Sequence, residues 1–342
     1  MKAARIHQHG GPEVLVYEDA PDPVFAPDQA LIRVRACALN HLDLWVRAGI
    51  PGMKVPMPHI LGSDAAGEVV GTGALCRRVK LGQRVLISPG QSCRQCEKCL
   101  MGRDNECPRY TLLGTTIDGG NAEFVAVPEY GVIPIPDDLG FEEAAAAPLV
   151  FVTAWHMLFT RAELKPGEDV LVLAASSGVG MAAIQLAKLF HSRVIATAGG
   201  EAKMDLARRL GADYVIDHYK QDIAAEVKRI TARRGVDVVF EHVGAATWPA
   251  SMQSLAPAGR VVTCGATTGY DVKIDLRFLF NRQQSVLGSF MGTQGELHQV
   301  LKFVFRKLVR PVVDRVYPLA EISAAHERLE KKEQFGKIVV VP

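Results

Sequence analysis

The spacing of hydrophobic and polar residues changes along the chain near residue 130. Before Pro128, short runs alternate between apolar and polar residues, as half-buried strands do. Residues 30–39 (ALIRVRACAL) are the longest such run, and glycine bounds two shorter ones, 67–73 (GEVVGTG) and 82–88 (GQRVLIS). This part therefore predicts a small β-rich domain.

From residue 141 onward, apolar runs alternate with helical patterns. A continuous apolar run such as 169–175 (DVLVLAA) is typical of a strand covered on both faces. Repeated βα units of this kind predict a doubly wound parallel sheet. The predicted strands are 169–175, 193–198, 214–217, 236–242, 260–265 and 285–290, and the predicted helices are 179–190, 201–212 (with Gly211 as C-terminal cap), 222–235 and 247–259.

After residue 292 the sequence predicts helices over 295–308 and 320–332 and a final strand over 336–341. The length of 342 residues is typical of two domains. The predicted fold class is α/β, with a β-rich domain and a doubly wound domain. The chain contains no internal repeat and no low-complexity tract.

Composition and charge narrow the possible partners. Lys and Arg number 39 and Asp and Glu 37, so the net charge of +2 gives no reason to expect nucleic acid or an anionic membrane as partner. The longest apolar run, 144–159, contains Pro148 and His156 and is too short to span a bilayer. The N-terminus lacks the apolar core of a signal peptide, so we expect a cytoplasmic protein.

Four of the seven cysteines lie within fifteen residues, in CRQCEKCLMGRDNEC. Short spacers allow four thiolates to turn inward and close a tetrahedral shell with no open position, as in structural zinc sites. A disulfide framework does not fit an intracellular chain of this size. The sequence predicts one structural Zn²⁺ per chain, bound by Cys93, Cys96, Cys99 and Cys107.

A glycine-containing turn joins the predicted strand 169–175 to the following helix. Such a turn lets the backbone approach a pyrophosphate, which the helix N-terminus then binds. Small residues replace two of the three usual glycines, so an ordinary turn before a helix is the alternative. The candidate cofactor contacts are Ser176, Ser177, Gly178, Val179 and Gly180.

The end of the next predicted strand bears on the choice of cofactor. Ala198 is followed by two glycines, a neutral site, and Lys203 is near enough to meet a 2′-phosphate. Glu201 argues for NAD(H) if it faces the ribose. We expect NADP(H), with NAD(H) as the alternative.

These residues together resemble the medium-chain dehydrogenase/reductase superfamily, which includes zinc alcohol dehydrogenases and quinone oxidoreductases. The resemblance covers nearly the whole chain and rests on LGSDAAGEV, the cysteine cluster, SSGVGMAAIQLAK and FGKIVV. It implies a GroES-like catalytic domain over 1–128 and 293–342, a Rossmann domain over 129–292, and a cleft between them. It also implies a homodimer or homotetramer, for which an edge strand near 285–290 is a candidate interface.

The catalytic zinc ligands of the family's alcohol dehydrogenases have no counterparts here. Asn40, Ser63 and a position near Leu149 stand where such ligands would be, so we expect no catalytic zinc. One alternative keeps a displaced zinc on Cys37, His41, His59 and Asp64.

The segment NHLDLWVRAG resembles the zinc-free quinone oxidoreductase branch. The resemblance implies hydride transfer between nicotinamide and a quinone, enone or carbonyl/alcohol substrate. The developing oxyanion needs hydrogen-bond donors, for which Asn40 and His41 are candidates, and Asp43 is expected to orient them. Asn40 as a turn cap and His41 without a catalytic duty are the structural alternatives.

Further cofactor contacts follow later strands or come from the resemblance alone. The carboxyl ends of parallel strands are where ligands bind in open α/β sheets. The candidates are Cys264, Gly265, Phe290 and Met291, and, from the resemblance, Lys337. A cofactor-binding protein without turnover is the remaining alternative to an enzyme.

Overall fold

The computed structural model describes all residues, 1–342, and divides them into two compact units. The first comprises 1–149 and 293–342, and the second comprises 150–292. The chain re-enters the first unit at residue 293, which is the expected boundary. Residues 129–149, expected in the nucleotide-binding domain, belong to the first unit, where β10 pairs with β6.

The first unit is built on a seven-stranded sheet with a smaller three-stranded sheet and a hairpin. The large sheet has the order β10-β6-β5-β3-β18-β17, with β9 also paired to β3. Its strands are β3 (Gln29–Ala38), β5 (Asp64–Thr72), β6 (Arg84–Ile87), β9 (Phe124–Pro128), β10 (Val132–Pro134), β17 (Val313–Pro318) and β18 (Lys337–Val341). The small sheet is β2 (Leu15–Asp19), β1 (Lys2–Ile6) and β4 (His59–Ile60), and the hairpin is β7 (Gly90–Gln91) with β8 (Thr111–Leu112).

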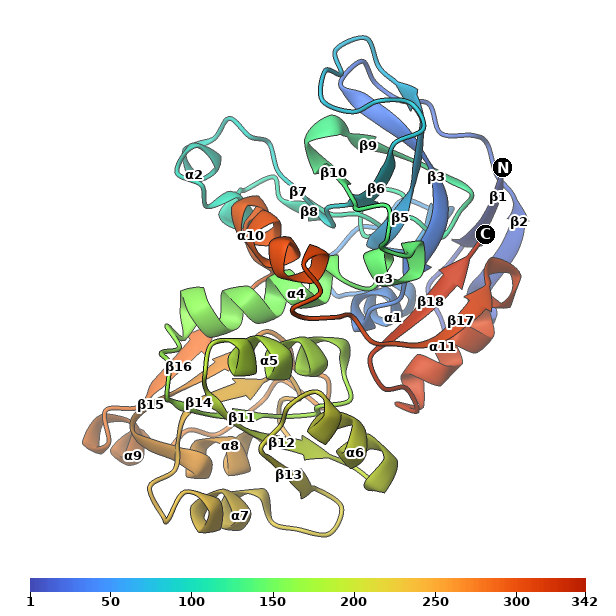
Figure 1. Cartoon of the computed structure of the whole chain (residues 1–342). Coiled ribbons are helices and arrows are strands. Elements are labelled where there is room, and N and C mark those ends of the chain that lie inside the picture. Colours follow the sequence, from blue (N-terminus) through green and yellow to red (C-terminus); the bar gives the residue numbers. More distant parts are fainter. The chain divides into compact units, whose positions relative to one another are not determined.

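The helices of this unit are short except for two near the C-terminus. Figure 1 shows α2 on a separate lobe next to the paired strands β7 and β8, and it shows α11 beside β17 and β18. They are α1 (His41–Ala48), α2 (Glu97–Leu100), α3 (Phe141–Ala145), α10 (Gln294–Phe305) and α11 (Ile322–Glu330), while α4 (Pro148–Trp155) spans the boundary between the units. The apolar side chains that alternate along β3, including Ile32 and Val34, form the core of this unit with Val85 and Ile338.

The second unit is a six-stranded parallel sheet in the order β13-β12-β11-β14-β15-β16. Figure 1 shows α5 on one side of this sheet and α7 with α8 on the other. This arrangement confirms the predicted doubly wound sheet. Its strands are β11 (Asp169–Val172), β12 (Arg193–Ala198), β13 (Tyr214–Asp217), β14 (Val236–Glu241), β15 (Leu255–Thr263) and β16 (Ser285–Gly288), and its helices are α5 (Gly178–Leu189), α6 (Glu201–Arg209), α7 (Ile223–Ile230), α8 (Trp248–Ser254) and α9 (Leu276–Asn281).

Two predicted helices are too long: 222–235, where α7 ends at Ile230, and 247–259. In the second case α8 ends at Ser254 and β15 begins at Leu255, opposite Val236 of β14. Pro257 explains this second difference, because proline disfavours helical geometry in the residue before it and has no N–H to donate. Elsewhere, Gly211 follows α6 with φ of +104°, as a C-terminal cap requires. No helix in the structure is both long enough and apolar enough to cross a membrane.

Candidate functional site

The four clustered cysteines converge on one point of the lobe that carries α2. Their sulfur atoms all lie within 4.8 Å of one another. The Sγ–Sγ distances are 3.4 Å for Cys93–Cys107, 3.5 Å for Cys96–Cys99, 3.8 Å for Cys96–Cys107 and 3.9 Å for Cys93–Cys99. A tetrahedral zinc with Zn–S bonds of about 2.3 Å requires sulfurs about 3.8 Å apart. The shell therefore fits zinc and leaves no position for a substrate.

The surroundings of the Cys93 sulfur favour a thiolate, whereas at Cys96 a backbone N–H of Cys99 acts in that direction but desolvation and the neighbouring thiols raise the pKa to about 11. The N–H groups of Cys93 and Arg109 point at Cys107 Sγ, at 3.5 and 3.4 Å. The N–H group of Gln95 is the largest of several hydrogen-bond effects that lower the pKa of Cys93 to about 5. Because zinc binds the deprotonated thiol, these contacts assist its binding.

A second polar cluster is buried in the first unit where three strands of the large sheet meet. Lys337 begins β18, Asp64 begins β5, and Asn40 follows the end of β3. Lys337 Nζ lies 3.0 Å from Asp64 Oδ2 and also donates to Asn40 Oδ1. Asn40 Nδ2 donates to Asp64 Oδ2 at 2.9 Å. Lys337 is only 2% exposed and Asp64 is 0% exposed, so this is a buried, hydrogen-bonded ion pair.

Asp43 extends this cluster into α1. Its Oδ2 accepts from the N–H of Asn40 at 2.7 Å, and its Oδ1 accepts from the N–H of Gly62 at 3.0 Å. Burial raises the pKa of the Asp43 carboxyl to about 6, although both N–H groups and Lys337 act in the opposite direction. With its oxygens committed to the backbone, Asp43 holds the start of α1 in place.

The residues at the family's catalytic zinc positions form hydrogen bonds within the protein. Ser63 Oγ donates to Leu113 O at 2.6 Å, and the N–H of Leu149 donates to Asp64 Oδ1 at 3.0 Å. Asn40 has its carbonyl on Lys337 and one N–H on Asp64. A metal shell does not fit these side chains.

The residues of the displaced-zinc alternative are not brought together either. Among residues 1–342, the four-cysteine cluster is the one group of three or more His, Cys, Asp or Glu side chains close enough to share a metal. Cys37 is fully buried in β3, where burial raises the pKa of its thiol, and His59 faces Asp118 at 3.3 Å. His41 begins α1 with its ring 6.4 Å from that of Trp45.

In the second unit, the nucleotide turn has the geometry that a pyrophosphate site requires. Ser177 caps α5, and its Oγ accepts from the N–H of Gly180 at 2.9 Å. A Cβ added at Gly180 would meet Ala174 O at 2.4 Å, so only glycine allows this close approach of helix to strand. Ser177 Oγ also lies 3.3 Å from His242 Nε2, and burial lowers the pKa of that imidazole.

The other predicted cofactor residues of this unit also fall at the carboxyl ends of strands. Ala198 ends β12, Cys264 and Gly265 follow β15, and Phe290 and Met291 follow β16. Phe290 is 59% exposed, whereas Met291 is 7% exposed with its sulfur 3.9 Å from Thr153 Oγ1. These residues therefore share one edge of the sheet with the turn 176–180. The side chain of Met291, however, is buried against Thr153.

Lys337 does not have the surroundings that we expected of a cofactor contact. Its ammonium group is buried against Asp64 and Asn40. Sequence reasoning missed the Lys337–Asp64 pair because these residues are far apart along the chain. The one available signal was a charged residue at the start of each of two apolar strands, LGSDAAGEV and FGKIVV.

Both units match known families. Residues 26–137 match the family described as "alcohol dehydrogenase GroES-like domain", and residues 178–306 match "zinc-binding dehydrogenase". A quinone oxidoreductase of Pongo abelii is 30% identical, with 96% of this chain and 94% of that protein covered. An NAD-dependent alcohol dehydrogenase of Sulfolobus acidocaldarius is 31% identical, with 99% of each covered. The chain belongs to the medium-chain dehydrogenase/reductase superfamily.

Solved structures of the superfamily agree with this assignment. The crystal structure of an NAD-dependent alcohol dehydrogenase covers 100% of both chains with 44% identity and a TM-score of 0.97. The chain is therefore an oxidoreductase of the medium-chain type with a GroES-like and a Rossmann-like unit. The four-cysteine shell and the turn 176–180 are the parts of this chain that fit the zinc and the nicotinamide cofactor of such enzymes.

Proposed function

We propose that this protein is an NADP(H)-dependent reductase of quinones, enones or carbonyl compounds that works without a catalytic metal. The observation that carries the proposal is the Lys337–Asp64–Asn40 cluster, in which Asn40, at one of the family's metal positions, is bonded to Lys337 and Asp64. The nicotinamide cofactor supplies the hydride when bound. The chain's own task is then to bind the substrate and to deliver a proton to its oxygen.

His41 is the proposed proton donor. It is the first residue of α1, whose start is held by the bonds of Asp43 to two backbone N–H groups. Asn40 is a poorer candidate for donating a hydrogen bond to the oxyanion, because one N–H of its amide already donates to Asp64. The alcohol direction of the same reaction uses the same groups in reverse.

The preference for NADP(H) rests on the charges after β12. Glu201, which would repel a 2′-phosphate, instead pairs with Arg208 of the same helix at 2.8 Å. Lys203 and Asp217 both act on His218: burial lowers the pKa of that imidazole, Asp217 acts in the opposite direction and Lys203 lowers it further. A 2′-phosphate at this point would be attracted by Lys203 and repelled by Asp217, so the support for NADP(H) is the neutral end of β12 together with Lys203. Relatives named as NAD-dependent make NAD(H) the alternative.

Steady-state oxidation of NADPH and NADH with a panel of quinones, enones and aldehydes tests the proposal. We expect turnover with NADPH by zinc-loaded protein containing one metal per chain, and a large loss of kcat in His41→Phe. Trp45→Phe, one helical turn along α1, is the matched control. Two metals per chain, or bound NADPH without turnover across the panel, would contradict the proposal, and the second result would favour a binding protein.

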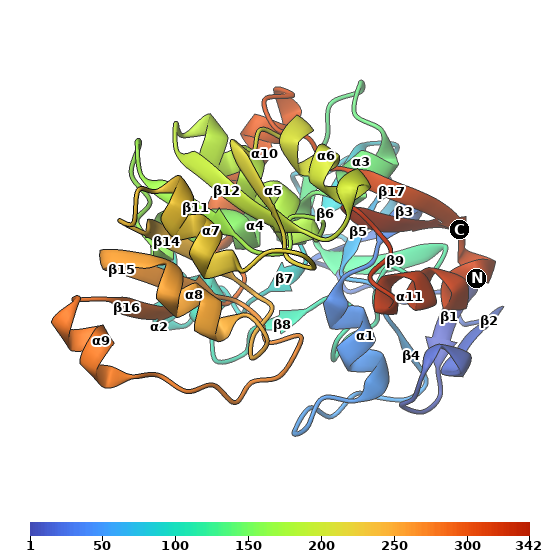
Figure 2. The ribbon, with the colours of Figure 1, turned by 90° about the horizontal axis from the view of Figure 1, so that it is seen from below.

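We also propose that two copies associate through β16. This strand is the edge of its sheet, and α9 lies near it (Figure 2). Large apolar side chains on α9 are exposed, at 65% for Leu276, 57% for Phe278 and 70% for Phe280. An unpaired edge flanked by apolar surface suits a second copy across a twofold axis. Light scattering after size exclusion should show a smaller species for Val286→Lys but not for Leu75→Lys, an exposed position of the first unit.

A further inference from the structure

A hollow of about 590 Å³ lies on the first unit beside the four-cysteine lobe. Three arginines line it, together with two carboxylates: Arg78, Arg94, Arg109, Asp28 and Glu129. All of its residues belong to the first unit, so it is distinct from the nucleotide turn of the second. Its volume lies within the range of small-molecule sites.

Separate contacts position each arginine. Arg94 lies over the ring of Tyr130 with its guanidinium carbon 4.6 Å from the ring centre. The Tyr130 hydroxyl accepts from the N–H of Ser92 at 3.0 Å and donates to Ser92 O at 3.1 Å, which fixes the segment that carries Arg94. The guanidinium group of Arg109 lies close to the Cys93 sulfur, and the backbone N–H of Arg109 donates to Cys107 Sγ at 3.4 Å.

Glu129 anchors the third arginine without forming an ion pair with it. One oxygen of Glu129 accepts from the backbone N–H groups of Arg77 at 2.6 Å, Val79 at 3.1 Å and Arg78 between them. The Glu129 carboxylate is thereby fixed by the backbone and keeps its negative charge, which still attracts Arg78, while the Arg78 side chain lines the hollow. None of the three guanidinium groups forms a direct ion pair with a carboxylate, so three positive charges face the two negative charges of Asp28 and Glu129 in the lining.

Preorganised guanidinium groups that are not directly bonded to a carboxylate match the chemistry of phosphate. The planar fork of arginine donates two parallel hydrogen bonds to a phosphate, and the stacking of Arg94 on Tyr130 reduces the entropy lost when it does so. We propose that this hollow binds a phosphate-bearing small molecule, with Arg78 and Arg94 holding the phosphate and Arg109 at its border. The negative charge of zinc-bound thiolates would explain an arginine at position 109, but it would not explain Arg78 or Arg94.

Calorimetric titration of full-length, zinc-loaded protein with inorganic pyrophosphate tests this site. We expect binding that persists in saturating NADPH and a Kd that rises about tenfold or more in Arg78→Ala/Arg94→Ala, as the loss of charged hydrogen bonds predicts. Arg33→Ala/Arg315→Ala is the matched control, because these arginines also lie over aromatic rings, those of Phe124 and Tyr317, and the net charge changes equally.

Other results would overturn the proposal. Pyrophosphate binding that NADPH abolishes and that the Arg78 and Arg94 changes leave intact would belong to the nucleotide turn alone. Equal losses in both double variants would indicate general attraction to a positive surface, and no binding at millimolar pyrophosphate would also exclude the site. Unchanged zinc content shows that the lobe is folded, and the single variants Arg78→Gln and Arg94→Gln replace the double variant should it fail to fold.

Discussion

Lys337 Nζ lies 3.0 Å from Asp64 Oδ2, although the two residues are 273 positions apart in the sequence. They meet because β5 and β18 both border β3, and because Ala38 near the end of β3 pairs with Asp64 on one side and Val339 on the other. The fold thus joins β5 to the carboxyl-terminal strand beside Asn40, one of the positions where the family's alcohol dehydrogenases are expected to have a zinc ligand. A buried ammonium group and an amide occupy that place here.

Removing the ammonium should destabilise the protein strongly. Lys337→Met leaves Asp64 buried without its charge partner, which costs about 3–5 kcal/mol for a buried pair. Thermal or urea unfolding of zinc-loaded protein would measure the loss, and the double change Lys337→Met/Asp64→Leu should recover part of it. Lys331→Met is the matched control, because its ion pair with Glu327 is exposed and contributes less than about 1 kcal/mol. Equal costs for both lysines would contradict this account.

Asp43 should make stability depend on pH in a predictable direction. Burial raises the pKa of its carboxyl from the model-compound 3.8 to about 6, so the folded state retains a proton that the unfolded state has lost. The free energy of unfolding therefore falls as pH rises from about 4 to about 6, by up to about 3 kcal/mol. Asp43→Asn lacks this titration, so the stability advantage of the wild type over the variant should shrink over that range. A difference that stays constant, measured by urea unfolding across pH, would show that Asp43 does not titrate there.

The four cysteines should account for all tightly bound zinc. Cys96→Ser removes one thiolate from a closed shell, so we expect loss of the metal and a lower unfolding temperature while the affinity for nicotinamide cofactor is kept. Metal content by mass spectrometry and cofactor binding by fluorescence measure the two effects. Cys264→Ser serves as the control and should retain one zinc per chain. Zinc that survives the Cys96 change would place the metal elsewhere.

The nucleotide turn should tolerate no side chain at Gly180. In Gly180→Ala the new Cβ would meet Ala174 O at 2.4 Å, and the resulting shift of α5 should cost about 1–3 kcal/mol and weaken cofactor binding. Gly295→Ala is the matched control in α10, where the nearest atom, Thr293 Oγ1, is 3.7 Å away and the change should be neutral or stabilising. Dye-monitored melting and cofactor titration would compare them. Similar behaviour of the two variants would argue against the close packing of α5.

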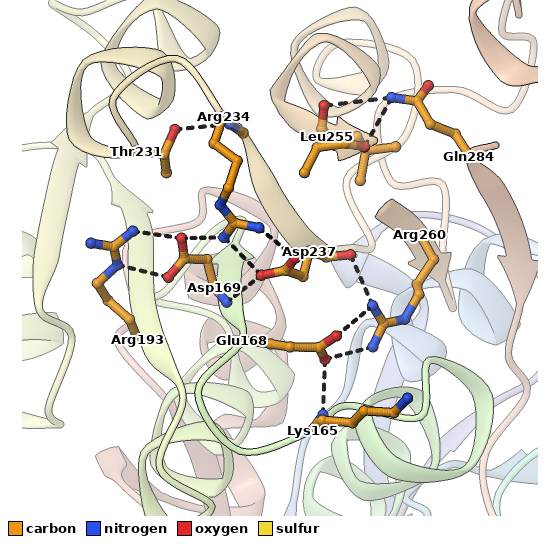
Figure 3. Close-up of polar contacts among 12 residues, drawn as sticks. Lys165, Glu168, Asp169, Arg193, Thr231, Arg234, Asp237, Leu255, Arg260 and Gln284 are labelled. Carbon is orange, nitrogen blue, oxygen red and sulfur yellow. Dashed lines mark hydrogen bonds and ion pairs between the residues drawn. The ribbon is translucent and has the colours of Figure 1, made fainter. Parts of the chain in front are cut away.

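Charges at the amino-terminal edge of the second unit's sheet should stabilise it (Figure 3). Asp169, at the start of β11, accepts from Arg193 at 2.5 and 2.7 Å and from Arg234 at 2.7 Å. Asp169→Asn leaves both arginines without this carboxylate and should cost about 1–3 kcal/mol, a value reduced by their partial exposure. Glu201→Gln, which breaks only the exposed pair with Arg208, is the control for denaturant unfolding. If Asp169→Asn unfolds at the same denaturant concentration as the wild type, the network does not stabilise the unit.

The local pattern of residues was enough to predict most elements and two sites. Continuous apolar runs predicted β11, β12 and β14, because strands covered on both faces need no polar side chains. The spacing of Cys93, Cys96, Cys99 and Cys107 predicted their shell, since three short spacers and one turn suffice to bring thiols together. The turn at Ser177 and Gly180 was equally local. The pattern was misleading at Leu255, where apolar spacing predicted a continued helix but the nearby Pro257 favours a strand.

Contacts between distant segments could not be predicted in this way. Nothing near Lys337 in the sequence indicates Asp64 or Asn40, and nothing near Glu129 indicates that its carboxylate accepts hydrogen bonds from the backbone of residues 77–79. The sequence alone determined the four-cysteine cluster, the turn before α5 and the order of strands and helices, because these depend on short-range spacing and apolar periodicity. Only the tertiary structure decided which charges are buried together, because strand pairing across the sheet sets those partners.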